Sequence, residues 1–537
     1  MAEMKYDFVI KNAKIMDGSG TPWFKGDVAV RGDRIQKIGH LADTEACRVI
    51  DGTGKILTPG FIDTHTHLDL SPFPFYPSQD PGSVRRLQQG VTTQIVGCCG
   101  ISPAPVTEKT KKEWLERTFG INCPEKACWT DFGQYLQALG NRPLGVNYAC
   151  YVGHGAIRHC VMGYENRPAS PAEIGRMQKI LDQAMADGAV GMSSGLIYAP
   201  GVFAETEELI ELCAVLKDYN GIYASHIRSE NQRWLESVEE VIQVCEKNQI
   251  PGIVHHLKTK AKESKILVQK VLQAISDARE RDVDVVFEQY PYEASATGLD
   301  VVLSSWMLEG GKEAIRKRLS DPSRFAEYRQ SIRSDYGWKE DEDEWKGAKK
   351  MLILSAKDHP EYVGRRIDEI ARDLGKEPVE TVFQVLLETD LQAGAAFFGI
   401  KDEDICTILR SPYGMVGSDS DDCKIGETTH PRTIGTFPRV LKEYALRRKV
   451  ISLETAVYKM TGFPAAKFSL RGRGLIREGF YADLVLLDPE TLEDRATYLE
   501  PFMEPAGFDM VFVNGKPALE KGEATGCMAG RVTGPRF

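Results

Sequence analysis

The segment TPGFIDTHTHLD, residues 58–69, decides how the rest of the chain is interpreted. A Pro-Gly turn leads into Phe61 and Ile62, which are typical of a short buried strand. Because side chains on a strand alternate between its two faces, His65 and His67 should point the same way. Two imidazoles that converge at a strand end are suited to bind a divalent metal ion. By itself, the His-X-His pattern also fits an ordinary polar strand end.

The composition indicates a globular protein without a nucleic-acid or membrane partner. The chain has 537 residues, a net charge of -10, a pI of about 5.7 and a mean hydropathy of -0.30. An acidic balance disfavours binding to nucleic acid. The first residues lack the apolar core of a signal peptide, and no apolar run is long enough to span a bilayer, so we expect a cytoplasmic protein. The 12 cysteines follow no regular spacing and should be thiols or metal ligands.

Short strand-like runs occur at both ends of the chain, and the middle alternates strands with amphipathic helices. We expect residues 1–57 and 465–537 to fold together into one small β-sandwich, because neither segment can bury a core alone. The strands predicted between them, in residues 58–464, are 61–64, 91–97, 147–152, 189–193, 222–225, 252–255, 283–287 and 415–418. Eight strands alternating with helices predict an α/β fold, a TIM-like (β/α)8 barrel.

One segment, residues 296–347, interrupts this alternation. It is charged, indicates helices, and is far too long for a connection between a strand and a helix. We therefore expect an inserted helical subdomain above the mouth of the barrel. It could act as a lid over the site. The alternative is a surface elaboration without a catalytic part.

Polar residues follow five of the predicted strands, at the barrel end where catalytic residues lie. These residues are His65 and His67, Cys98 and Cys99, His226, His255 and His256, and Asp419. Strand alternation allows only one of Cys98 and Cys99, and only one of His255 and His256, to face the mouth. Alternation alone does not decide which. Imidazoles, a thiol and a carboxylate gathered in this way predict a metal site.

These residues and further motifs resemble the amidohydrolase superfamily, and most closely its N-acyl-D-amino-acid deacylases. The matching motifs are GFIDTHTH (60–67), GVTT (90–93), GCCG (97–100), VGHG (152–155), GLIYAPG (195–201), QYPY (289–292), GSD (417–419), HPR (430–432), GLIREG (474–479) and ADLV (482–485). The His-X-His and ADLV motifs are shared across the superfamily. The Cys-Gly and His-Pro-Arg motifs are more particular to the deacylases.

The resemblance implies zinc and a set of ligands. It implies a tight zinc ion on Cys99, His226 and His256, and a second, weaker site on His65, His67 and Asp419 with the Cys99 thiolate as a bridge. Asp419 would take a proton from a water activated by zinc and pass it to the leaving nitrogen. The predicted fourth strand, near residues 191–195, has no lysine, which argues against the hydantoinase and dihydroorotase branch.

The resemblance also implies a small-molecule substrate with a free carboxylate. Arg432 and Lys258 would bind that carboxylate, and Tyr198 and Tyr290 would contribute hydroxyls. The alternatives are surface charges for the two cations and packing roles for the two tyrosines.

Some residues depart from the family pattern. Cys98 stands where asparagine is usual, His255 where serine is usual, and Ala296 where the family has a substrate-binding serine. Asp421 and Asp422 add negative charge beside Asp419. That charge favours neutral, hydrophobic D-residues over acidic ones.

We therefore expect zinc-dependent hydrolysis of N-acyl-D-amino acids to a carboxylate and a free D-amino acid. The alternatives are a peptidase for dipeptides with a C-terminal D-residue, a cyclic-amide hydrolase, and a metal-bound scaffolding protein without catalysis. If blocking the substrate carboxylate abolished activity, the deacylase would be favoured over ring opening.

Overall fold

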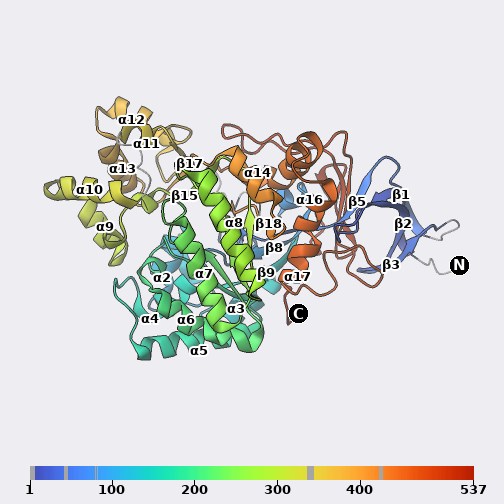
Figure 1. Ribbon diagram of the computed structural model, residues 1–537, viewed down its shortest axis with the longest axis horizontal. Helices are drawn as coiled ribbons and strands as arrows, with labels where there is room; N and C mark the ends of the chain where they lie inside the picture. The colour runs from blue at the N-terminus through green and yellow to red at the C-terminus, as the bar shows by residue number, and fades with distance from the viewer. Residues whose placement is uncertain are drawn as a thin grey trace.

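The computed structural model has an α/β body in the middle, a β-sheet at one end and a separate group of helices at the other (Figure 1). The structure describes residues 6–41, 46–78, 80, 83–121, 123–335, 344–422 and 427–536. Among these residues, no helix combines the length and the apolar character needed to cross a membrane.

All eight strands predicted for the middle of the chain are present and run parallel in two sheets, which hold nine strands because the strand predicted at 147–152 is divided in two. The first sheet contains β6 (Phe61–Asp63), β8 (Val91–Val96) and β9 (Asn147–Cys150); the second contains β10 (Val152–Gly153), β11 (Gly191–Gly195), β12 (Ile222–His226), β13 (Gly252–Val254), β14 (Val285–Gln289) and β18 (Gly414–Val416). The backbone N–H of Val190 donates to the Cys150 carbonyl across 2.9 Å and links the two sheets. Two short strands follow β6 and β18: β7 (Thr66–His67) and β19 (Ser420–Asp421). They pair with each other, so the chain after the last of the eight predicted strands lies beside the chain after the first.

Helices follow most of these strands. They are α1 (Val84–Leu87), α2 (Lys111–Phe119), α3 (Phe132–Gly140), α4 (His154–Met162), α5 (Pro171–Asp187), α6 (Thr206–Cys213), α7 (Trp234–Asn248), α8 (Ser264–Glu280), α14 (Asp402–Arg410), α15 (Arg432–Arg439), α16 (Leu453–Met460) and α17 (Gly462–Lys467). The sequence at the start of α5 is typical of a helix N-terminus. Ser170 and Glu173 form a capping box, and Pro171 is the first residue of the helix.

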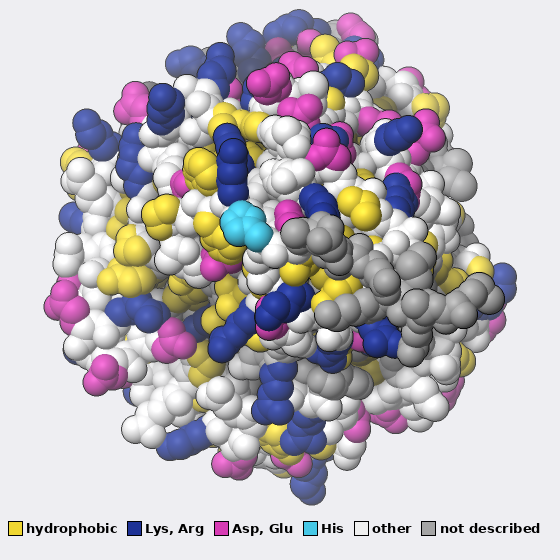
Figure 2. Space-filling view, turned by 90° about the vertical axis from the view of Figure 1, so that its right-hand side faces the viewer, with side chains coloured by type: hydrophobic (Ala, Val, Ile, Leu, Met, Phe, Trp, Pro, Cys, Tyr) yellow, Lys and Arg dark blue, Asp and Glu magenta, His cyan; other side chains and the backbone are white. Residues whose placement is uncertain are grey.

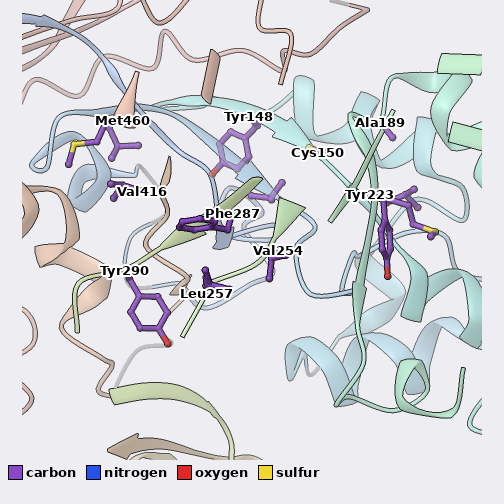
Figure 3. Close-up of a cluster of buried hydrophobic side chains, with 14 of the residues drawn as sticks. Tyr148, Cys150, Ala189, Tyr223, Val254, Leu257, Phe287, Tyr290, Val416 and Met460 are labelled. Atoms are coloured by element: carbon purple, nitrogen blue, oxygen red, sulfur yellow. The ribbon is translucent and has the colours of Figure 1, made fainter. Parts of the chain in front are cut away.

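The strands bury side chains on both faces. On one face, Tyr148, Val254, Phe287 and Val416 pack with Met460 of α16 (Figure 3). On the opposite face, a second hydrophobic cluster takes residues from all eight strands or from positions next to them. They are Ile62, Ile95, Ala149, Val190, Ile222, Ile253, Val286 and Met415. Burial on both faces explains the near-continuous apolar runs by which the strands were predicted.

The two ends of the chain join in one nine-stranded sheet. It contains β1 (Tyr6–Ile15), β2 (Phe24–Arg31), β3 (Arg34–Gly39), β4 (Ala46–Asp51) and β5 (Ile56–Pro59) with β20 (Leu484–Leu487), β21 (Phe508–Val513), β22 (Lys516–Glu520) and β23 (Glu523–Ala524). The antiparallel pair β5–β20 connects the two parts, and Phe8 stacks on Phe512 with ring centroids 4.4 Å apart. On the surface at this end, acidic and basic side chains are interspersed (Figure 2).

The expected insertion is the first part of a longer unit. Strands β15 (Ala294–Gly298), β16 (Met351–Ala356) and β17 (Ala393–Phe398) form an antiparallel sheet, accompanied by α9 (Gly311–Leu319), α10 (Phe325–Asp335), α11 (Glu344–Ala348), α12 (Ile367–Leu374) and α13 (Pro378–Glu388). These elements share a hydrophobic cluster that extends to Phe397, beyond the expected end at residue 347. Residues 336–343 of the expected insertion lie outside the described part of the chain.

Candidate metal centre

Three of the predicted ligands meet where β8, β12 and β13 end. Cys99 Sγ lies 3.6 Å from His226 Nδ1 and 3.6 Å from His256 Nε2. A tetrahedral zinc ion with ordinary bond lengths holds a sulfur and a nitrogen ligand about 3.6 Å apart. The two histidine nitrogens are closer, at 2.8 Å. All three side chains are buried, and their donor atoms fit a zinc shell.

The other three predicted ligands lie directly beside this group. His65 Nε2 is 3.3 Å from Cys99 Sγ and 3.3 Å from Asp419 Oδ1. His67 Nε2 is also 3.3 Å from Asp419 Oδ1. The structure therefore brings all six residues together, with Cys99 in contact with both halves of the cluster.

The backbone is unusual at three of these positions. Cys99, His256 and Asp419 have φ values of 53°, 33° and 52°, in the left-handed region that non-glycine residues rarely adopt. Hydrogen bonds hold two of them: Asp419 N donates to the His65 carbonyl across 2.8 Å, and His256 N donates to Glu288 Oε1 across 2.7 Å. Strained backbone of this kind is concentrated at functional sites.

Burial sets the protonation of the ligands. It lowers the pKa of His65 to about 4 and the pKa values of His226 and His256 well below the usual range, so the rings are neutral. Burial raises the pKa of the Cys99 thiol, which must lose its proton when a metal binds. Burial also opposes the charge on Asp419, but the Arg432 guanidinium and the hydrogen bond from His67 outweigh it and hold the Asp419 pKa well below its usual range.

Two carboxylates at the site, the buried Glu288 and the partly buried Glu230, were missed by the sequence analysis. Glu288 Oε1 lies 2.5 Å from His65 Nδ1 and 3.0 Å from His255 Nδ1. Glu230 Oε1 lies 3.2 Å from His256 Nδ1. A carboxylate on one ring nitrogen directs the other nitrogen toward a metal. The available signal was weak: Glu288 follows the apolar run of a strand, and Glu230 is four residues after a ligand.

The two predicted substrate-binding cations are paired within the chain. Arg432 is 1% exposed; its Nη1 donates to Asp419 across 2.6 Å and its Nη2 to Asp421 across 3.1 Å. Lys258 Nζ donates to Glu230 across 2.5 Å and lies 2.8 Å from His256 Nδ1. Both cations thus lie at the site and contact ligands.

The two predicted tyrosines lie beside these cations. The Tyr290 ring lies 4.9 Å from the Arg432 guanidinium carbon and 5.6 Å from Lys258 Nζ. Its buried hydroxyl has no hydrogen-bond partner among the described residues. The Tyr198 hydroxyl is 3.0 Å from Thr297 Oγ1, on a strand of the long insertion.

A cavity of about 360 Å³ opens onto the cluster. Its walls include His67, Cys99 and Asp419 on the metal side and Tyr198 beside them. The insertion forms another wall through residues 296–298 and 393–395. A small molecule that enters this cavity reaches the metal ligands directly.

Comparisons with known proteins agree with this site. The model of the amidohydrolase family matches residues 48–303 and 354–518. D-aminoacylase from Alcaligenes xylosoxydans xylosoxydans is 35% identical over 528 residues, which cover 98% of this chain and 97% of the relative. A crystal structure of N-acyl-D-glutamate deacylase from Bordetella bronchiseptica, complexed with zinc and a phosphonate mimic of the tetrahedral intermediate, has a TM-score of 0.81 and 31% identity, covering 98% of this chain and 99% of that one.

A further solved structure concerns the binuclear metal centre of D-aminoacylase. It is 35% identical to this chain with a TM-score of 0.81, and the match covers 98% of this chain and 100% of that one. Its description attributes activation to one metal and attenuation to the second.

Proposed function

Because the chain belongs to the amidohydrolase family and, within it, to the N-acyl-D-amino-acid deacylases, we propose that it hydrolyses the amide bond of N-acyl-D-amino acids. The products are a carboxylate and a free D-amino acid. The observation that carries the proposal is the cluster of six metal-ligand side chains at the end of a 360 Å³ cavity.

The scaffold we infer is a (β/α)8 barrel over residues 58–464, with the two chain ends forming a small β domain beside it. The interior cluster with residues from all eight strands supports a closed arrangement. The pairing of β19 with β7 supports closure between the last strand and the first. We propose that the insertion acts as a lid over the substrate, which is supported by its contribution to a wall of the cavity.

The residues fit zinc, and we assign Cys99, His226 and His256 to a tight site. His65, His67 and Asp419 form the second, weaker site. When bound, zinc supplies a Lewis acid that polarises a carbonyl oxygen and activates water near neutral pH. One thiolate with two neutral imidazoles leaves a coordination position open, as catalytic zinc sites require.

Asp419 is the residue that we assign to proton transfer. Its carboxylate borders the cavity and is ionised, so it can accept a proton from the attacking water. It then returns that proton to the amide nitrogen, which leaves as an amine. His65 and His67 hold one of its oxygens, Oδ1, at 3.3 Å, and Arg432 holds the other, Oδ2.

The substrate carboxylate binds, in our proposal, between Arg432, Lys258 and the two tyrosines. Tyr290 is the strongest support, because its ring lies near both cations and its buried hydroxyl has no described partner. An unpaired buried hydroxyl is costly and gains a charge-assisted hydrogen bond when a carboxylate arrives. Tyr198 lines the cavity and adds a second hydroxyl.

The charges of the cavity favour a neutral, hydrophobic D-residue. Among the described lining residues Arg117 is the one Lys or Arg, whereas the acidic lining residues are Asp300, Asp419, Asp421, Asp422 and Glu427. An additional carboxylate on the substrate side chain would face this excess of negative charge.

The test is to incubate the zinc-loaded protein with racemic N-acetyl-methionine and to determine the chirality of the released amino acid. We expect free D-methionine and unchanged N-acetyl-L-methionine. Release of L-methionine, or no release while a hydantoin is opened, would refute the proposed function.

A further inference from the structure

A second donor cluster lies next to the metal centre, and the proposed function leaves two of its three residues, Cys98 and His255, unused. It consists of Cys98, His255 and His65, each of which offers one ligand atom, and these atoms lie within 4.8 Å of one another. All three residues are almost fully buried, at 0%, 1% and 0% exposure. We call this group the inner cluster.

His255 is held in the orientation of a metal ligand. Its Nδ1 lies 3.0 Å from Glu288 Oε1, the oxygen that also contacts Nδ1 of His65. A ring that donates through Nδ1 to a carboxylate has its lone pair on Nε2. His255 Nε2 is buried and has no hydrogen-bond partner among the described residues. A buried acceptor without a partner is costly, so this nitrogen needs a ligand.

The inner cluster also contains a soft ligand. Cys98 Sγ lies 3.8 Å from the Ile95 carbonyl, at the distance of a weak hydrogen bond. A thiolate with two imidazoles is a donor set that selects zinc and other thiophilic ions over magnesium or calcium. The His65 and His255 rings are 4.2 Å apart between centroids, and both contact the same Glu288 oxygen, so the two rings lie side by side at the inner cluster.

We propose that Cys98, His255 and His65 form an additional binding site for a thiophilic divalent ion of the zinc class. Binding forms a bond from the ion to Cys98 Sγ, and the thiol proton leaves to solvent. His65 belongs to both the inner cluster and the weaker site with His67 and Asp419, and because its Nδ1 contacts Glu288, its free nitrogen Nε2 binds an ion in one of these two sites at a time. The inner site goes beyond the proposed function, since none of its three residues is exposed to the cavity where substrate binds.

The test is a cadmium titration of the protein after dialysis against a chelator, followed by thiolate-to-metal absorbance and by bound metal per chain after gel filtration. We expect two steps in the wild-type absorbance, one for Cys99 and one for Cys98. Cys98→Ser and His255→Ser should each remove the second step and one bound ion per chain. Cys150→Ser, which changes another buried thiol outside both clusters, should keep both steps.

His255→Ser is the decisive variant, because it leaves every thiol in place and still should remove a thiolate signal. A single step in the wild type, or two steps that survive in both variants, overturns the proposal. If Cys98→Ser does not fold, as judged by circular dichroism, the wild-type titration and His255→Ser still decide. Metal content and absorbance do not depend on turnover, so a failure here is separate from a failure with N-acetyl-D-methionine.

Discussion

The substitution Glu288→Gln tests how the metal ligands are oriented. One oxygen of Glu288, Oε1, contacts His65 Nδ1 at 2.5 Å, His256 N at 2.7 Å and His255 Nδ1 at 3.0 Å. The other oxygen is buried without a described partner. Glutamine has the same shape and can keep its carbonyl oxygen at the Oε1 position. The substitution therefore removes the negative charge and leaves the packing in place.

The magnitude follows from two weakened hydrogen bonds. A hydrogen bond to a charged group contributes about 1.5–3 kcal/mol and a neutral one about 0.5–1.5 kcal/mol, so each imidazole contact should lose about 1 kcal/mol. The loss at His65 corresponds to about fivefold weaker binding at the site with His67 and Asp419, and the loss at His255 to about fivefold weaker binding at the inner cluster. Each effect lies near the lower end of the roughly 10–100-fold effects of removing a hydrogen-bonding partner behind a metal ligand.

The assay is competition between the protein and a chromophoric chelator for zinc, at fixed pH and ionic strength. We expect the weaker zinc site of Glu288→Gln, which contains His65, to lose affinity about fivefold. The matched control is Glu208→Gln, which changes a buried carboxylate 2.9 Å from His154 Nε2, away from the described metal ligands. Equal zinc affinities in the wild type and a folded Glu288→Gln protein would refute the reasoning.

Three further predictions follow from the site. Asp419→Asn should keep the tight zinc ion at Cys99 and lower kcat for N-acetyl-D-methionine by about 10²–10⁴-fold. Unchanged turnover would show that Asp419 does not transfer the proton. Tyr290→Phe should lower kcat/KM by about 10–100-fold through the lost charge-assisted hydrogen bond, and an unaltered value would place the carboxylate elsewhere. N-acetyl-D-aspartate should have a lower kcat/KM than N-acetyl-D-methionine because of the acidic cavity wall, and the reverse order would contradict the proposed side-chain preference.

The sequence predicted the strands well because their signal is local. Each is a short apolar run between turn residues, and burial on both faces keeps the run continuous. Local sequence patterns did not predict contacts between segments that are distant in the sequence. Glu288 and His65 are 223 residues apart in the sequence, and nothing in either local pattern indicates that they meet. The extent of the insertion was also underestimated, because its closing strand β17 follows several helices that read as separate elements.

The choice between Cys98 and Cys99 shows a different limit. Alternation assumes an extended strand, but the backbone of Cys99 is left-handed, with φ of 53°, and the same holds for His256, with φ of 33°. A left-handed residue departs from the extended backbone, so the rule of alternating faces no longer applies at the position that is predicted to bind the metal. The sequence therefore leaves the choice between Cys98 and Cys99 open because the backbone at Cys99 is strained.

One carboxylate, that of Glu288, holds strained backbone at His256 and contacts residues of both donor clusters. Left-handed backbone at a non-glycine residue costs about 1–3 kcal/mol and persists only where neighbouring groups hold it. At His256 the holding group is Glu288, which accepts the backbone N–H, and Glu288 also contacts a ring nitrogen of His65 and of His255. One buried carboxylate thus fixes the backbone of one tight ligand and the rings of a weaker-site ligand and of the inner cluster. A change at Glu288 should accordingly alter metal binding at all three places, whereas a change at Cys98 should alter only the inner cluster.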